Sequence, residues 1–205
     1  MSSSREEMLI IGVGGGTASG KTTFVRQLAS KATQDLCSVI ELDWYYRDFP
    51  KLTKEERDEL NFDHPDSLEA NLLVQHLKEL KEGKTIKAPQ YDFSTHKRSD
   101  RYIEIIPKPL IVVEGILALH YPELRKIYTR GYFVDHSDED RLIRRMERDI
   151  RERGRTEESV RKQWEKTVHP MHRQFCYPSS NFAVKKVSGV GVDIETIDEI
   201  LGLIR

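Results

Sequence analysis

The chain has 205 residues, enough for one domain with a substantial core, and its 38% hydrophobic and 33% charged residues are typical of a globular protein. A net charge of −1, from 33 Lys and Arg against 34 Asp and Glu, creates no global field that would attract nucleic acid or an acidic membrane. Two cysteines are too few for a disulfide framework, no apolar run approaches the ~20 residues of a membrane span, and the N-terminus lacks a signal-peptide pattern, so we expect a cytoplasmic protein with no membrane or nucleic-acid partner.

Strands and helices alternate along the chain, which predicts an α/β fold with a parallel sheet flanked by helices. Short apolar runs predict strands at 8–13, 38–42, 109–114 and 132–134. Apolar residues at helical spacing predict helices at 24–31, 68–81, 138–153 and 157–169. Two extended arms, 85–93 and 101–106, surround a polar tip at 94–100 and predict a β-hairpin outside the main sheet. No repeat or linker divides the chain, so we expect a single domain over 1–205.

The stretch GGTASGKT, residues 15–22, matches the full G-x-x-x-x-G-K-[ST] pattern between a predicted strand and a predicted helix. Glycines let backbone N–H groups surround phosphate oxygens, and the helix N-terminus adds partial positive charge. Lys21 would neutralise phosphate charge, and the Thr22 hydroxyl is placed to bind Mg²⁺. The strict dinucleotide pattern G-x-G-x-x-G fails at every register through 12–20, which leaves a helix-capping turn as the other reading. We predict a nucleoside triphosphate site formed by Gly15, Gly16, Thr17, Ala18, Ser19, Gly20, Lys21, Thr22 and Thr23.

Two carboxylates stand at predicted strand ends near this loop. Asp43 follows the second strand and Glu114 ends the third, at the edge where open α/β sheets hold their chemistry. Glu114 suits Mg²⁺, and Asp43 suits the orientation of an acceptor hydroxyl; the alternative is that either acid is merely solvated or caps a helix. Because the chain lacks the N-K-x-D stretch of signalling GTPases and is too short for a motor or helicase ATPase, a kinase of small molecules fits best.

An arginine-rich stretch follows the fourth predicted strand. Within twelve residues it contains Arg144, Arg145, Arg148, Arg151, Arg153 and Arg155. The interleaved Glu and Asp argue against a nucleic-acid surface. We interpret 141–173 as a helical lid, with a hinge at Gly154, that brings arginines onto the triphosphate; the alternative is a solvated helix with Glu–Arg pairs.

Several separate stretches together resemble the uridine kinase (uridine–cytidine kinase) family of the phosphoribulokinase/uridine kinase group. They are GGTASGKTT, LDWYYRD, NFDHPDS, PQYDFSTHKR, VVEGILAL, RRMERDIRERGR and the Q-x-x-x-T-V-x-P-M stretch from Gln163, and they cover about residues 8–183. The resemblance implies a P-loop kinase that uses ATP and Mg²⁺ to phosphorylate the 5′-hydroxyl of uridine and cytidine, giving UMP and CMP in pyrimidine salvage. It also implies a substrate-side hairpin and a homo-oligomer, often a tetramer.

The resemblance also implies roles for individual residues. Asp43 is similar to the family's general base, Thr22 and Glu114 to its Mg²⁺ ligands, and Arg148 and Arg153 to lid residues near the ATP phosphates. The substrate-binding set is Tyr46, Asp63, Tyr91, Phe93, His96, Arg145, Arg155 and Gln163. In this set Asp63 holds the ribose hydroxyls, while Tyr91 and His96 read the edge of the base. Because the His96 ring can donate or accept by tautomer, we expect both nucleosides to be accepted.

The C-terminal part departs from the family pattern. It reads VKKVSGVGVDIETI, with Lys185 and Lys186 inside the expected strand and no Pro-Arg turn, so no nucleotide contact is assigned there. Two other hypotheses stay open. One is a kinase of another small alcohol, such as ribulose 5-phosphate or nicotinamide riboside; the other is a non-catalytic ATP- or RNA-binding module.

Overall fold

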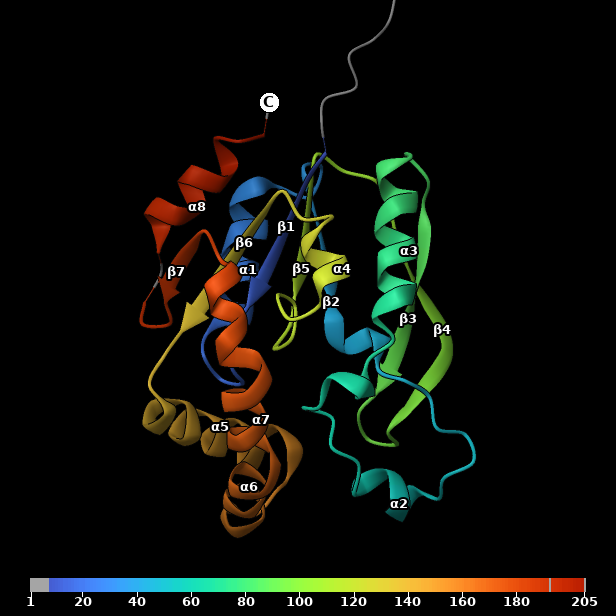
Figure 1. The fold of residues 1–205 in the computed structure, drawn as a ribbon, viewed down its shortest axis with the longest axis vertical. Helices are drawn as coiled ribbons and strands as arrows, with labels where there is room; N and C mark the ends of the chain where they lie inside the picture. The colour runs from blue at the N-terminus through green and yellow to red at the C-terminus, as the bar shows by residue number, and fades with distance from the viewer. Residues whose placement is uncertain (1–7, 192, 205) are drawn as a thin grey trace, which may run out of the picture.

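The computed structural model describes residues 8–191 and 193–204, and its centre is a five-stranded parallel sheet in the order β2–β5–β1–β6–β7 (Figure 1). The strands are β1 (Leu9–Gly14), β2 (Cys37–Glu41), β5 (Leu110–Glu114), β6 (Arg130–Asp135) and β7 (Lys185–Ser188). The predicted α/β fold is confirmed. The four predicted strands are present with ends shifted by only one or two residues.

Helices cover both faces of this sheet. Figure 1 shows α1 (Lys21–Ala32) and α8 (Ile194–Leu201) on one side, and α3 (Ala70–Lys81) with the hairpin on the other. Ile10 and Ile11 of β1 are both fully buried, and they belong to the two different cores on these two sides. A strand buried on both faces must be apolar at consecutive positions, which explains the continuous apolar runs in the sequence.

Strand β7 forms at the sheet edge in spite of its lysines. It pairs in parallel with β6, and Val187 supplies its buried side chain. Lys185 lies 3.5 Å from a Glu199 carboxylate oxygen, and the Lys186 ammonium lies 5.0 Å from the Tyr177 ring centroid. Because an edge strand has one unpaired side, lysines there are tolerated and discourage pairing with another chain. The two lysines therefore do not interrupt the strand.

The hairpin is a separate antiparallel pair, β3 (Ile86–Asp92) and β4 (Lys97–Ile105). The sequence predicted a tip at 94–100, but pairing resumes already at Lys97, opposite Asp92. The Asp92 carboxylate accepts hydrogen bonds from the Ser94 backbone N–H and hydroxyl and from the Thr95 hydroxyl, at 2.6–3.0 Å. These bonds close a short turn, so the predicted tip was too long.

The predicted lid is a chain of helices beyond the carboxyl ends of the strands (Figure 1). Helix α5 (Asp138–Arg153) has the predicted bounds and ends at Gly154, whose φ of +62° is the left-handed conformation typical of a helix C-terminus. Helix α6 (Glu157–Gln163) begins as predicted, but the winding continues well past residue 169. The continuation consists of the π-helix η3 (Trp164–Val168), α7 (His169–Met171), the π-helix η4 (His172–Cys176) and the 3₁₀ helix η5 (Tyr177–Phe182).

Short helices complete the connections. They are η1 (Leu42–Tyr45), α2 (Lys54–Asp58), η2 (Pro65–Ser67) and α4 (Pro122–Arg125). Within the described ranges, no helix combines the length and the apolar character that a membrane crossing requires.

Candidate active site

The phosphate loop joins β1 to α1 and contains backbone conformations that glycine adopts easily. Gly15 has a φ of +151° and Gly20 a φ of +94°, and a Cβ on Gly15 would lie 2.5 Å from the Val134 carbonyl oxygen. So close an approach leaves room only for glycine. Helix α1 begins at Lys21 without a side-chain cap, so its first backbone N–H groups can receive a phosphate.

A carboxylate and a hydroxyl meet beside this loop. Glu114 is 6% exposed; its Oε1 accepts a hydrogen bond from Thr22 Oγ1 at 2.9 Å, and its Oε2 lies 3.9 Å from Lys21 Nζ. The sheet register places Glu114 level with Val13 of β1 and Glu41 of β2. Parallel strands therefore deliver this carboxylate to the edge at which the phosphate loop begins.

The Thr22 and Glu114 oxygens fit a Mg²⁺ ion. Both are hard donors, and their 2.9 Å separation is close to that of neighbouring ligands in a regular octahedron with bonds of about 2.0–2.1 Å. Magnesium in phosphoryl-transfer sites takes one or two protein ligands together with phosphate oxygens and water. The described part of the chain contains no cluster of three His, Cys, Asp or Glu side chains suited to hold a metal alone.

Two further acids lie near Lys21. Asp43 is in η1, just past the end of β2; burial raises the pKa of its carboxyl to about 6, Lys21 opposes the rise, and Glu114 and Asp63 add to it. Burial also raises the pKa of Asp63, against the opposing charges of Arg145 and Lys21. A carboxyl with a pKa near 6 can take up a proton close to neutral pH, as a general base must.

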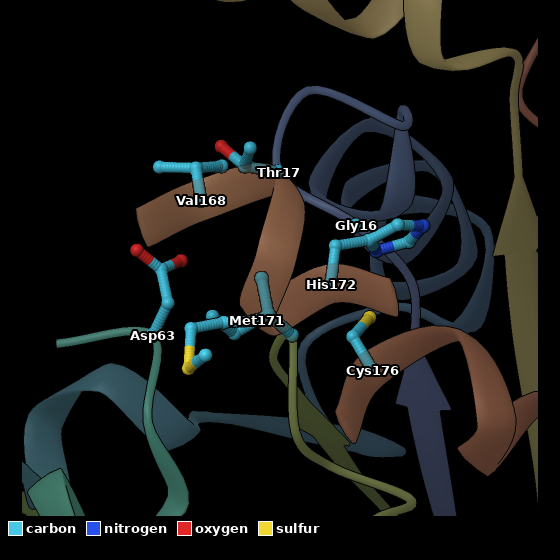
Figure 2. Close-up of a pocket in the computed structure, with 8 residues that line it drawn as sticks. Gly16, Thr17, Asp63, Val168, Met171, His172 and Cys176 are labelled. Carbon is cyan, nitrogen blue, oxygen red and sulfur yellow. The ribbon is translucent and has the colours of Figure 1, made fainter. Parts of the chain in front are cut away.

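Asp63 lines a small pocket together with the phosphate loop. Figure 2 shows it on its own loop, facing the lid helices that carry Val168, Met171 and His172. The complete lining is Gly16, Thr17, Asp63, Ile116, Val168, Met171, His172 and Cys176. Burial raises the pKa of Cys176 to about 12, so its thiol is a wall of the pocket and not a nucleophile.

A buried aspartate gathers the arginines of the lid. Asp149 is fully buried, and nitrogens of four arginines lie 2.8–3.9 Å from its carboxylate oxygens. They belong to Arg145, Arg148, Arg153 and Arg155. A charge buried this completely persists only when it is paired, and here one acid fixes the positions of four cations.

Arg145 links the lid to the phosphate loop. Its side chain is buried; Nη1 donates to Thr17 Oγ1 at 3.0 Å, and Nη2 donates to Gln163 Oε1 at 2.9 Å. Arg155 donates to the same Gln163 oxygen. Arg145, Arg155 and Gln163, which the sequence analysis assigned to substrate binding, therefore lie together beside the phosphate loop.

Aromatic rings gather between η1 and the hairpin. Tyr46 is buried, and its ring centroid lies 5.2 Å from that of Phe62 and 5.3 Å from that of Tyr91. Phe62 stacks on His96 at 4.6 Å, with the ring planes 14° apart. Among the described residues, Tyr91 Oη and His96 Nδ1 are buried and have no hydrogen-bond partner. Buried polar atoms are nearly always paired, so these two suggest a ligand that supplies their partners.

Two of the predicted site residues are about half exposed. Phe93, in the hairpin turn, is 47% exposed, although its ring lies 5.4 Å from that of Tyr91. The Arg153 side chain is 49% exposed and, like Arg148, pairs with Asp149. In the stretch LDWYYRD, Tyr45 is fully buried and its hydroxyl pairs with His76 Nδ1 at 2.9 Å, so this ring belongs to the core.

Two residues of the site escaped the sequence analysis. Asp149 was counted only among the acids that argue against a nucleic-acid surface, although it stands four positions after Arg145, at contact spacing on a helix. Phe62 precedes Asp63 in the NFDHPDS stretch, and an aromatic residue beside a candidate binding acid was the available signal.

The divergent turn after β7 also reaches the phosphate loop. A Cβ on Gly20 would lie 3.1 Å from the Gly189 carbonyl oxygen, and that oxygen accepts a hydrogen bond from Arg144 Nη1 at 2.9 Å. The backbone of the turn thus lies against the loop without the Pro-Arg pattern. The sequence alone did not predict this contact between the turn and the loop, because it depends on the close approach of Gly20 and Gly189.

Comparison with known proteins places the chain in a family. The family model described as "Phosphoribulokinase / Uridine kinase family" matches residues 10–190 of this chain. A uridine kinase of Clostridium perfringens (strain 13 / Type A) is 42% identical over 96% of this chain and 95% of its own length. A uridine kinase of Halalkalibacterium halodurans is 43% identical over 96% of this chain and 93% of its own length.

Solved structures share the fold at low sequence identity. Phosphoribulokinase from Rhodobacter spheroides has a TM-score of 0.67 at 16% identity, covering 89% of this chain and 70% of that one. D-glycerate 3-kinase from Cryptococcus neoformans var. grubii has a TM-score of 0.63 at 16% identity, covering 93% of this chain and 91% of that one. From the family match and the curated relatives, the chain belongs to the phosphoribulokinase/uridine kinase family.

Proposed function

We propose that this protein transfers the γ-phosphoryl group of ATP to the 5′-hydroxyl of uridine, and also of cytidine. The proposal is supported by the family, by relatives named uridine kinase that match nearly the whole chain, and by the site. The observation that carries it is the convergence of Asp43, Glu114 and Lys21 at one sheet edge, opposite a cluster of aromatic rings.

Asp43 is the proposed general base. A 5′-hydroxyl beside its carboxylate would lose its proton to Asp43 as the oxygen attacks the γ-phosphorus. The raised pKa, about 6, suits this role, since a base works best when its pKa is close to the working pH. Asp63, close enough to influence the pKa of Asp43, would accept hydrogen bonds from the vicinal ribose hydroxyls and so aim the 5′-oxygen at the phosphate.

The phosphate loop and the lid arginines would hold the triphosphate. Lys21 and the N–H groups at the start of α1 would neutralise charge on the phosphate oxygens, and Arg148 and Arg153 would add positive charge when the nucleotide is bound. Thr22 and Glu114 would hold Mg²⁺, which supplies charge neutralisation on the β- and γ-phosphates. Transfer then depends mainly on positioning and electrostatics, and little on covalent chemistry by the protein.

The aromatic cluster would receive the pyrimidine. Tyr46, Phe62 and Tyr91 provide apolar ring surfaces, while Tyr91 Oη and His96 Nδ1 provide polar atoms that have no partner within 8–191 and 193–204. A sugar phosphate such as ribulose 5-phosphate would leave these atoms unpaired. We further propose a role in pyrimidine salvage and a homo-oligomer, as the resemblance implies, and a cytoplasmic location, as the composition of the sequence suggests.

A direct assay tests the proposal. The purified protein should form UMP from uridine and CMP from cytidine when ATP and Mg²⁺ are present, with products identified by mass. Ribulose 5-phosphate and nicotinamide riboside serve as competing acceptors. Turnover of either competitor, with no turnover of uridine or cytidine, would show that the site serves a different alcohol.

A further inference from the structure

The short helix α2 and the hairpin turn form one structural unit at the edge of the aromatic cluster. Arg57 of α2 is buried; its Nε donates to the Thr95 carbonyl oxygen at 3.0 Å, and Nη1 donates to the Leu52 carbonyl oxygen. These bonds fix α2 against the residue that precedes His96. Asp58 follows Arg57 in α2, so the hydrogen bonds of the Arg57 side chain also set where Asp58 lies relative to His96.

His96 is held in one orientation by its backbone conformation and by two side-chain contacts. Its backbone has a φ of +52°, in the left-handed region that few residues other than Gly, Asn, Asp and His adopt. Phe62 stacks on one face of its ring at 4.6 Å. Its Nε2 lies 3.7 Å from Asp58 Oδ1, and the other Asp58 oxygen accepts a hydrogen bond from Lys54 Nζ at 2.8 Å.

The two ring nitrogens of His96 therefore face different partners. Nε2 faces a carboxylate, whereas Nδ1 is buried and has no partner among the described residues. A nearby negative charge favours the tautomer that carries its hydrogen on Nε2, because the N–H dipole then points toward the carboxylate. In that tautomer Nδ1 presents a lone pair and can only accept a hydrogen bond.

We propose that Asp58 is a positioning residue that sets the tautomer of His96 and thereby the choice between cytidine and uridine. The inference rests on the proposed function. With hydrogen on Nε2, the Nδ1 lone pair accepts from the 4-amino group of cytosine. Uracil presents a 4-oxo group, which needs a hydrogen on Nδ1. A hydrogen on Nδ1 is present in the imidazolium. It is also present in the other neutral tautomer, but that tautomer is disfavoured because its Nε2 lone pair faces the Asp58 carboxylate.

The surrounding charges determine how the choice responds to pH. Burial lowers the pKa of His96; Asp58 and Asp92 oppose this effect, and Lys54 and Arg57 reinforce it. The ring therefore loses its proton at a lower pH than an ordinary histidine, and in the neutral ring the Nε2–H tautomer favours cytidine. Protonation at lower pH places hydrogen on Nδ1 and pairs the imidazolium with Asp58, which favours uridine. The ratio of kcat/KM for uridine to kcat/KM for cytidine should fall as pH rises.

The measurement is this ratio, from pH 6 to pH 8, for the wild-type enzyme and for Asp58→Asn. Taking a ratio cancels pH effects common to both nucleosides, including the ionisation of Asp43. Asp58→Asn removes the charge that favours Nε2–H, so the uridine-to-cytidine ratio at pH 8 should rise about fivefold, the worth of one modest hydrogen bond. The ratio should also depend less on pH between 6 and 8, because without Asp58 the pKa of His96 falls further. Asp58→Glu keeps the charge and should keep the wild-type pH trend.

A spectroscopic readout separates this role from a merely structural one. In protein labelled with ¹⁵N-histidine, the His96 signals, identified by their loss in His96→Gln, should show Nε2–H in the wild type and a shift toward Nδ1–H in Asp58→Asn. Glu55→Gln removes the same charge from an exposed position of the same helix and is the matched control. It should leave both the ratio and the spectrum unchanged.

The outcomes are distinguishable. If the wild type phosphorylates neither nucleoside, the proposed function is wrong, and the ¹⁵N spectrum alone decides whether Asp58 sets the tautomer. If both nucleosides react but Asp58→Asn changes neither the ratio nor the tautomer, the proposed function stands and the role of Asp58 is refuted. An equal change of the ratio in Glu55→Gln would refute it as well, since the effect would then be one of general charge.

Discussion

Thr22 donates its hydroxyl hydrogen to Glu114 at 2.9 Å, which ties the first turn of α1 to the end of β5. The same carboxylate lies 3.9 Å from Lys21 Nζ. One acid thus faces both the hydroxyl proposed to bind Mg²⁺ and the lysine proposed to contact phosphate. Because the sheet register fixes Glu114, its side chain can be altered without disturbing the backbone of the phosphate loop.

Glu114→Gln should weaken the use of Mg²⁺. The amide can still accept the Thr22 hydrogen bond, but it lacks the charge that attracts a divalent cation. The Mg²⁺ concentration that gives half-maximal activity should rise on the order of 10–100-fold, a typical cost for damage to a metal site. A Mg²⁺ titration of the phosphorylation rate measures this, with Thr22→Ser as the control that retains the hydroxyl. An unchanged Mg²⁺ requirement would remove Glu114 from the metal site.

The rate should depend on the ionisation of Asp43. Because its pKa is raised to about 6, the carboxylate that acts as a base is lost as pH falls through this value. For both nucleosides, kcat/KM should fall about tenfold per unit of pH below 6. Asp43→Asn should lower kcat by about 10²–10⁴ while changing the affinity for uridine little. A comparable loss of binding and rate would instead make Asp43 a positioning residue.

Asp43→Asn should also stabilise the folded protein at neutral pH. A carboxyl whose pKa is raised on folding binds its proton more tightly in the folded state, so stability falls as pH rises from about 4, the pKa of an unfolded Asp, to about 6. Above pH 6 the destabilisation is fully present, and below pH 4 it is absent. Asp43→Asn should therefore raise Tm at pH 8 and leave it unchanged at pH 4. A lower Tm at pH 8 would contradict the raised pKa.

Local patterns in the sequence predicted the fold well. The G-x-x-x-x-G-K-[ST] stretch requires a strand before it and a helix after it, and β1 and α1 are present. Helix α5 has its predicted bounds because Ser137 caps its start, accepting from the Asp140 N–H, and Gly154 ends it. Each of these signals depends on residues that are neighbours along the chain.

The features that escaped prediction are a helical segment that contains a proline and a cluster of charges around one buried acid. The helical winding from 164 to 182 passes Pro170, which cannot donate the usual helical hydrogen bond, and it continues through π-helical turns. Arg145 and Arg153 lie four positions before and after Asp149 on α5, whereas Arg155 reaches it only because the chain turns back at Gly154. Helical spacing accounts for the contacts of Arg145 and Arg153, but it does not predict that four cations share one acid.

Asp149→Asn should therefore damage both stability and activity. Removing one member of a buried charge cluster leaves the others uncompensated, which typically costs about 3–5 kcal/mol in the free energy of unfolding. The arginines would also lose their common anchor, so kcat/KM should fall for uridine and cytidine alike. Urea unfolding and steady-state kinetics measure the two effects. Glu147→Gln, on an exposed position of α5, is the control and should change neither. A stable, fully active Asp149→Asn would show that the lid arginines need no anchor.

Tyr91→Phe should separate the nucleoside site from the stability of the protein. The Tyr91 hydroxyl is buried and has no hydrogen-bond partner in the part of the chain that the structure describes, so its removal should leave Tm unchanged or slightly higher. In the complex the same hydroxyl is proposed to bond the base, and KM for uridine should rise about 5–10-fold, with KM for ATP unchanged. Tyr45→Phe is the matched control, because the Tyr45 hydroxyl already pairs with His76 at 2.9 Å.

The control should show the opposite pattern from Tyr91→Phe. Loss of a satisfied buried hydrogen bond in Tyr45→Phe should lower the free energy of unfolding by about 1 kcal/mol and leave KM for uridine unchanged. Thermal melts and initial rates on the two variants give all four values. If Tyr91→Phe lowered Tm while KM for uridine stayed the same, the hydroxyl would serve the fold, and the hairpin would have no part in reading the base.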